Sequence, residues 1–138
     1  MNQPLLFDTS VWIDSMRKKV TPQTGLLNYY LKNGFEIPVI PIVLQELLQG
    51  IRDDLQYRKT KEVMRRFTRL EIAPMATAIG ASALFRTLRK KGVTIRKSND
   101  CIIAFYAMSF DLEVVHNDSN FDLISAHSAL KTWQNNKG

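Results

Sequence analysis

A short apolar run that ends in an acid constrains the fold of this chain more than any other feature. The run from Leu5 to Phe7 is typical of a strand buried on both faces of a parallel sheet. Asp8 follows at once, and Thr9 and Ser10 are residue types that begin helices. The carboxyl end of the first strand of an α/β chain lies where such folds bind ligands. Asp8 is therefore the first candidate for a metal-binding carboxylate.

The remaining apolar pattern predicts alternating strands and helices. Further strands are expected at 37–41, 71–74 and 112–116, and helices at 11–18, 22–34, 43–51, 56–70, 76–91 and 100–109. Beyond Ile124 the pattern is weak, and the polar tail from about 134 to 138 is expected to be mobile. This alternation predicts one α/β domain over residues 1–138, with a central, mainly parallel sheet flanked by helices on both faces.

Composition and charge favour a folded domain with an acidic partner. The chain has 138 residues, of which 45% are hydrophobic, so it can bury a core. No apolar run approaches the roughly 18 residues of a membrane span, and Asp8 and Asp14 interrupt the apolar start, unlike a signal peptide. A cytoplasmic protein without membrane contact is therefore expected. The net charge of +6 points to nucleic acid or to an acidic protein segment.

The single cysteine favours a structural role. Cys101 stands beside Ile102 and Ile103, so a buried thiol is expected rather than a nucleophile. With one cysteine, neither an intrachain disulfide nor a thiolate metal site can form. His116 and His127 lack the spacing of zinc ligands, which disfavours zinc as well.

Four acidic residues occupy positions where burial is expected. Asp8 ends the first strand, Glu46 lies on an apolar helix, Asp100 begins a buried helix and Asp118 follows the last strand. Taken singly, each has an ordinary explanation as a helix cap, a turn residue or a boundary residue paired with a lysine. Acids are seldom buried without a partner, and no lysine or arginine stands next to Asp8, Glu46 or Asp118 in the sequence. A shared cation explains the four together.

Carboxylate oxygens are the ligands that Mg²⁺ and Mn²⁺ prefer. A bound divalent ion lowers the pKa of a coordinated water, orients that water and stabilises charge on phosphate oxygens. Beside an electropositive surface, such an ion favours the hydrolysis of phosphodiester bonds.

Four stretches of the sequence together resemble the PIN-domain ribonucleases, in particular the VapC toxins of bacterial toxin–antitoxin pairs. The stretches are Phe7 to Asp14, Leu44 to Gly50, Asn99 to Ala104 and Val114 to Asp122. Each is weak alone, because an acid beside apolar residues is common, but their order and separation are specific. The resemblance implies a PIN-like fold and a metal-dependent endoribonuclease in which Asp8, Glu46, Asp100 and Asp118 hold Mg²⁺ or Mn²⁺. It also implies a VapB-like protein antitoxin that blocks the pocket, and a homodimer.

The resemblance leaves two residues with alternative roles. Asp122 competes with Asp118 as the fourth acid, because a threonine is common in the family where this chain has His116. Ser10 often contacts the site in this motif, and a role as helix cap is equally consistent with the sequence. Basic residues near the motifs are candidates for RNA binding, and they are Arg17, Lys18, Lys19, Arg96 and Lys97.

Two other functions remain open at the level of sequence. A signalling module with an acidic Mg²⁺ pocket, like phospho-accepting receiver domains, needs a lysine opposite a strand-end aspartate, and the only lysine near a late strand lies in the tail. A PIN fold retained only to bind protein partners would not need all four acids, and all four are present.

Overall fold

The computed structural model of the protein describes residues 3–135, and within them the chain forms seven helices and four short strands. In chain order these are β1 (Leu5–Phe7), α1 (Thr9–Met16), α2 (Pro22–Lys32), β2 (Pro38–Val39), α3 (Pro41–Gln49), α4 (Asp54–Met64), β3 (Thr68–Arg69), α5 (Pro74–Lys90), α6 (Asn99–Ser109), β4 (Glu113–Val115) and α7 (Ser119–Ala126). The expected alternation of strands and helices is confirmed.

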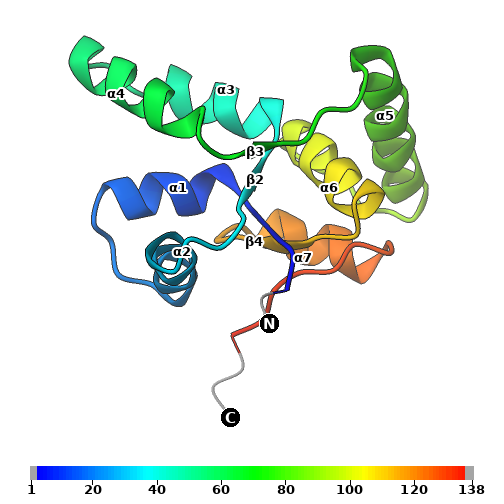
Figure 1. The fold of residues 1–138 in the computed structure, drawn as a ribbon. Coiled ribbons are helices and arrows are strands. Elements are labelled where there is room, and N and C mark those ends of the chain that lie inside the picture. The colour runs from blue at the N-terminus through cyan, green and yellow to red at the C-terminus, as the bar shows by residue number, and fades with distance from the viewer. Residues whose placement is uncertain (1–2, 136–138) are drawn as a thin grey trace.

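The strands form two parallel pairs in the centre of the molecule. β1 pairs with β4, placing Leu5 opposite Glu113 and Phe7 opposite Val115, while β2 pairs with β3. β1 and β2 also lie in contact, so the two pairs adjoin. Figure 1 shows α1 and α2 on one side of the strands and α5 and α6 on the other. This is the predicted parallel arrangement between helices, built from strands of only two or three residues.

The core explains why β1 and α6 are almost wholly apolar. Leu5 to Phe7 are buried along β1, and Ile103, Ala104 and Ala107 are fully buried on α6. α5 packs against α6 so closely that a Cβ on Gly80 would overlap the ring of Phe105. Both elements that carry a candidate acid at one end, Asp8 after β1 and Asp100 in the first turn of α6, are therefore fixed by the core.

The chain between α4 and α5 differs from the sequence prediction. The helix expected over 56–70 ends at Met64, and the strand expected at 71–74 lies at Thr68–Arg69. The cause is tertiary, because the ring of Phe67 packs edge-on against Trp12, with the ring centres 5.4 Å apart, and the backbone N–H of Leu70 donates to Val39 at 3.1 Å. Phe67 and Leu70 continue the apolar spacing of α4, but Phe67 packs against α1 and Leu70 hydrogen-bonds to β2.

The end of the chain holds a helix that the sequence did not predict as such. α7 begins directly after Asp118 and ends at Ala126. Of the tail expected to be mobile, residues 136–138 lie outside the described part, and Gln134 and Asn135 are exposed. Within residues 3–135 no helix combines the length and the apolar character that crossing a membrane requires.

Candidate active site

Asp8 lies at the carboxyl end of β1 and caps the N-terminus of α1. Its Oδ2 accepts hydrogen bonds from the backbone N–H of Ser10 at 3.2 Å and from the Ser10 hydroxyl at 2.7 Å. Ser10 therefore contacts the candidate site through both groups. Only 5% of Asp8 is exposed, and this burial raises the pKa of its carboxyl, with the charge of Glu46 acting in the same direction. The backbone N–H of Asp8 donates to Val115, so β4 holds it in place.

Glu46 borders the same region from α3. Its Oε1 accepts a hydrogen bond from the Thr9 hydroxyl at 2.8 Å, and its Oε2 accepts one from the Asn99 amide at 3.4 Å. These partners come from the first residues of α1 and α6. Glu46 therefore joins three helices at the edge of the site, through neutral donors rather than through a lysine.

Asp100 lies in the first turn of α6 with its carboxyl buried. It is 4% exposed, and its Oδ2 accepts a hydrogen bond from the side-chain amide of Asn120 at 3.0 Å. Burial, together with the charges of Asp8 and Asp118, raises the pKa of Asp100 to about 6, against the opposing effects of Asn120 and Lys97. Two acids from other elements thus lie close enough to act on it.

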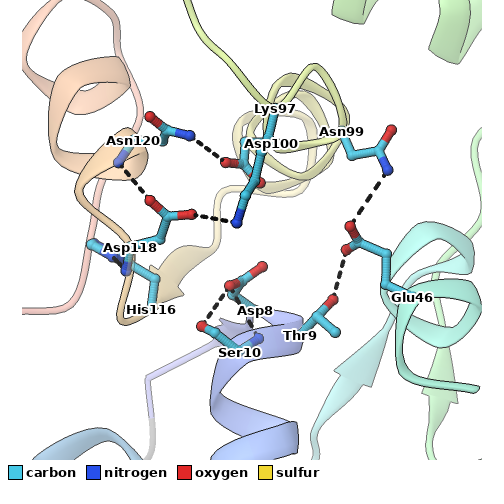
Figure 2. A network of polar contacts seen from close by, with 10 residues as sticks. All are labelled: Asp8, Thr9, Ser10, Glu46, Lys97, Asn99, Asp100, His116, Asp118 and Asn120. Carbon is cyan, nitrogen blue, oxygen red and sulfur yellow. Dashed lines mark hydrogen bonds and ion pairs between the residues drawn. The ribbon is translucent and has the colours of Figure 1, made fainter. Parts of the chain in front are cut away.

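Asp118 caps the N-terminus of α7 and faces Asp100. Its Oδ1 accepts a hydrogen bond from the backbone N–H of Asn120 at 2.9 Å, and its Oδ2 lies 3.6 Å from the Lys97 ammonium. Asn120 therefore holds two acids at once, Asp118 through its backbone and Asp100 through its side chain. Figure 2 shows the carboxylates of Asp8, Asp100 and Asp118 around one space, with Glu46 at its border.

Asp122 is placed differently from Asp118. Its side chain is 64% exposed and lies 3.4 Å from Nε2 of His116, while the other ring nitrogen of His116 accepts the backbone N–H of Asp118. His116 itself is buried against the ring of Phe121. Asp8, Asp100 and Asp118 form what we call the acid cluster, whereas Asp122 lies outside it, beside His116.

Comparison with known proteins identifies the family. A family model for the PIN domain matches residues 5–126. The chain belongs to the PIN domain family. VapC ribonuclease Mb1587 of Mycobacterium bovis and ribonuclease VapC11 of Mycobacterium tuberculosis are each 26% identical to it over 128 residues, which covers 92% of this chain and 96% of theirs. The resemblance inferred from the sequence is confirmed.

Solved structures show the same PIN fold. VapBC2 from Rickettsia felis, bound to a DNA fragment from its promoter, matches with a TM-score of 0.71 at 20% identity, over 94% of this chain and 98% of the other. VapBC-1 from nontypeable Haemophilus influenzae matches with a TM-score of 0.68 at 22% identity, over 94% and 96% of the two chains. The fold predicted from the sequence is thereby confirmed over nearly the whole PIN domain.

The carboxylate oxygens at this site suit a hard cation that keeps some of its water ligands, rather than one enclosed entirely by protein ligands. Within the described residues no three His, Cys, Asp or Glu side chains are gathered tightly enough to hold a metal ion between them. The binding of one ion by all four acids, which the resemblance implies, stays a prediction. Mg²⁺ commonly keeps several waters and binds proteins through one or two carboxylates. The buried oxygens of Asp8 and Asp100 and the half-buried Asp118 suit such an ion.

The basic residues proposed from sequence fall into two places. Lys97 reaches the acid cluster and Arg96 is exposed just before it. Arg17, Lys18 and Lys19 are exposed and follow the C-terminal end of α1. Because α1 has eight residues, this end lies about 12 Å along the helix axis from Asp8. Closeness in sequence to the first motif therefore does not bring these three cations to the acids.

Sequence reasoning missed the neutral residues that position the acids. Asn120 bridges Asp100 and Asp118, while Thr9 and Asn99 hold Glu46. A weak signal existed, because each is a small polar residue within two positions of an acid in the PIN motifs. Which acid each one would reach depends on how α1, α3, α6 and α7 meet, and that is not local information.

Proposed function

We propose that this PIN domain is a metal-dependent endoribonuclease of the VapC type that hydrolyses RNA and is inhibited by a protein antitoxin. The observation that carries the proposal is the group formed by Asp8, Asp100 and Asp118, which converge from three separate elements. The relatives named VapC ribonuclease, matched over 92% of this chain, support the same activity. Membership of the PIN domain family also argues against the alternative of a phospho-accepting signalling module.

In this proposal, Asp8, Asp100 and Asp118 would hold a hydrated Mg²⁺ or Mn²⁺, in part through its bound waters, with Glu46 at the border of the site. When bound, such an ion would supply a water of lowered pKa and would stabilise charge on the scissile phosphate. Ser10 fixes the Asp8 carboxylate, and Asn120 fixes those of Asp100 and Asp118, so that their oxygens keep one orientation. Such supporting hydrogen bonds orient ligands and tune their affinity for the metal.

The partner of the proposed enzyme is a VapB-like antitoxin. The fold neighbours from Rickettsia felis and Haemophilus influenzae are VapBC structures, and the domain described here overlays on nearly all of the matched chain in each. The homodimer, the cytoplasmic location and the extent of the domain over 1–138 remain predictions from the sequence. Expression of this protein alone is expected to arrest cell growth, and co-expression of a cognate VapB-like antitoxin is expected to relieve that arrest.

Removal of divalent ions is expected to abolish the activity. Purified protein in Mg²⁺ should cleave total cellular RNA into discrete fragments, and EDTA in excess should stop the cleavage, because the metal-activated water is lost. Excess Mg²⁺ or Mn²⁺ should then restore it. A preparation of the Asp8→Asn variant, purified in the same way, controls for contaminating ribonucleases. Cleavage by the wild type that persists in EDTA would refute the metal-dependent mechanism.

Asn120→Ala is expected to lower the rate of RNA cleavage by about 10- to 100-fold, the usual effect of losing a group that orients a metal ligand. The substitution removes the amide that donates to Asp100 but keeps the backbone N–H that donates to Asp118. Asn117→Ala is the matched control, because the exposed Asn117 donates to Asp14 instead. Rates of both variants should be compared at limiting and at saturating Mg²⁺, and equal rates under both conditions would exclude this role for Asn120.

A further inference from the structure

Lys97 places a positive charge at the mouth of the acid cluster. Its ammonium lies 3.6 Å from Oδ2 of Asp118, and its charge also holds down the pKa of Asp100. The backbone carbonyl of Lys97 accepts the N–H of Asp100 at 3.0 Å, so the first turn of α6 fixes the point from which this side chain extends. In Figure 2 the ammonium reaches into the space between the carboxylates of Asp8, Asp100 and Asp118.

We propose that Lys97 alternates between two anions: it neutralises Asp118 when the metal is absent, and it contacts an RNA phosphate when the metal is bound. The inference rests on the proposed function, since it assigns a role to a residue beside the same metal site. Without a divalent ion, Lys97 is the resident cation of the cluster. With one, the two cations compete for the same carboxylate oxygens.

Lys97 and the acids that it faces differ in their exposure to solvent. The side chain of Lys97 is 71% exposed, while that of Asp118 is 23% exposed and Asp100 is buried. A long exposed stem can turn away from the cluster without disturbing any packing. The carboxylates of Asp100 and Asp118 each accept a hydrogen bond from Asn120, which the lysine does not contribute and which stays when it leaves. Repulsion between an ammonium and a divalent ion therefore displaces the exposed lysine from the carboxylates, and its ammonium is then free to contact a phosphate of the RNA.

An ordinary surface ion pair would have no such role. Exposed pairs contribute little, and removing one usually changes nothing measurable. Here one ammonium acts on the buried Asp100 and on the half-buried Asp118, and burial reduces the screening of such an interaction by salt. Arg96, the preceding residue, carries the same charge but forms no ion pair with an acid in the described chain. The two cations can therefore be distinguished by experiment.

The first test measures Mn²⁺ binding to the full chain without RNA, from the electron paramagnetic resonance signal of free Mn²⁺. Lys97→Gln is expected to bind Mn²⁺ about three- to fivefold more tightly than the wild type. This factor corresponds to the upper end of the interaction energies measured for exposed ion pairs. Lys97→Arg, which keeps the charge, should bind like the wild type. Arg96→Gln removes the same charge one residue away and should have little effect. If Lys97→Gln binds no more tightly than Arg96→Gln, the proposal is wrong.

The second test measures steady-state cleavage of a labelled RNA that the wild type cleaves, at saturating Mg²⁺. Lys97→Gln should raise KM with little change in kcat, and should reduce the slope of log(kcat/KM) against log[salt] by about 0.7, the value for one phosphate contact on a single strand. An unchanged KM would overturn the phosphate contact. The proposed function fails separately, if the wild type binds no Mn²⁺ or cleaves RNA in EDTA.

Discussion

Single substitutions Asp8→Asn, Asp100→Asn and Asp118→Asn are each expected to reduce RNA cleavage by more than about a hundredfold, beyond the loss typical of a residue that only orients a metal ligand. Asparagine keeps the size of the side chain and removes its charge, so the ability to hold a divalent ion is what changes. The three carboxylates come from the end of β1, the first turn of α6 and the N-terminus of α7. Cleavage rates at fixed Mg²⁺, with melting temperatures to confirm folding, give the measurement.

Asp122→Asn is the control that decides which of the two acids after β4, Asp118 or Asp122, is needed for activity. Asp122 is exposed beside His116, whereas Asp118 lies beside Lys97 and raises the pKa of Asp100. The Asp122→Asn variant should therefore keep its cleavage rate within about threefold of the wild type, as expected for a surface substitution away from the cluster. An inactive Asp122→Asn beside an active Asp118→Asn would transfer the role to Asp122.

Locally determined features of the site could be predicted from the sequence. Asp8 follows an apolar strand and Asp100 begins an apolar helix, and each of these elements is specified by its own residues. In a parallel arrangement the end of β1 and the region after β4 must meet at the same edge. The convergence of Asp8 and Asp118 therefore follows from the order of the elements once both strands are recognised.

Features that depend on packing between elements could not be predicted. The turn after Met64 forms because the ring of Phe67 packs against Trp12 on α1. In the sequence, Phe67 continues the apolar spacing of α4, which is why the sequence predicts a longer helix. The bridge from Asn120 to Asp100 requires α7 to lie against α6, and 20 residues separate the partners. Arg17 is near Asp8 in sequence, but a helix of eight residues carries it away from the site. Sequence distance is a poor guide wherever an element lies between two residues.

Asp100→Asn is also expected to stabilise the metal-free protein at pH 8. Burial raises the pKa of Asp100 to about 6, whereas an unfolded aspartate titrates near about 3.9. The folded state therefore holds this proton more tightly than the unfolded state does. The cost of the ionised carboxylate is absent below about pH 4, grows as the pH rises, and is complete above about pH 6, where it reaches at most about 3 kcal/mol. Asparagine avoids this cost and can still accept the Asn120 amide.

Urea denaturation in EDTA at pH 4 and pH 8 measures the effect. The free energy of unfolding of Asp100→Asn should exceed that of the wild type at pH 8, and the difference should vanish at pH 4. Asp122→Asn, which changes an exposed acid, should show no such gain. Mg²⁺ at 100 times its Kd should stabilise the wild type by about 2.7 kcal/mol and the Asp100→Asn variant far less, because only the wild type keeps the full set of carboxylates. A variant that is no more stable at pH 8 than the wild type would show that Asp100 carries no ionisation cost, and the same acid would then be a weak candidate for a pocket built to receive a cation.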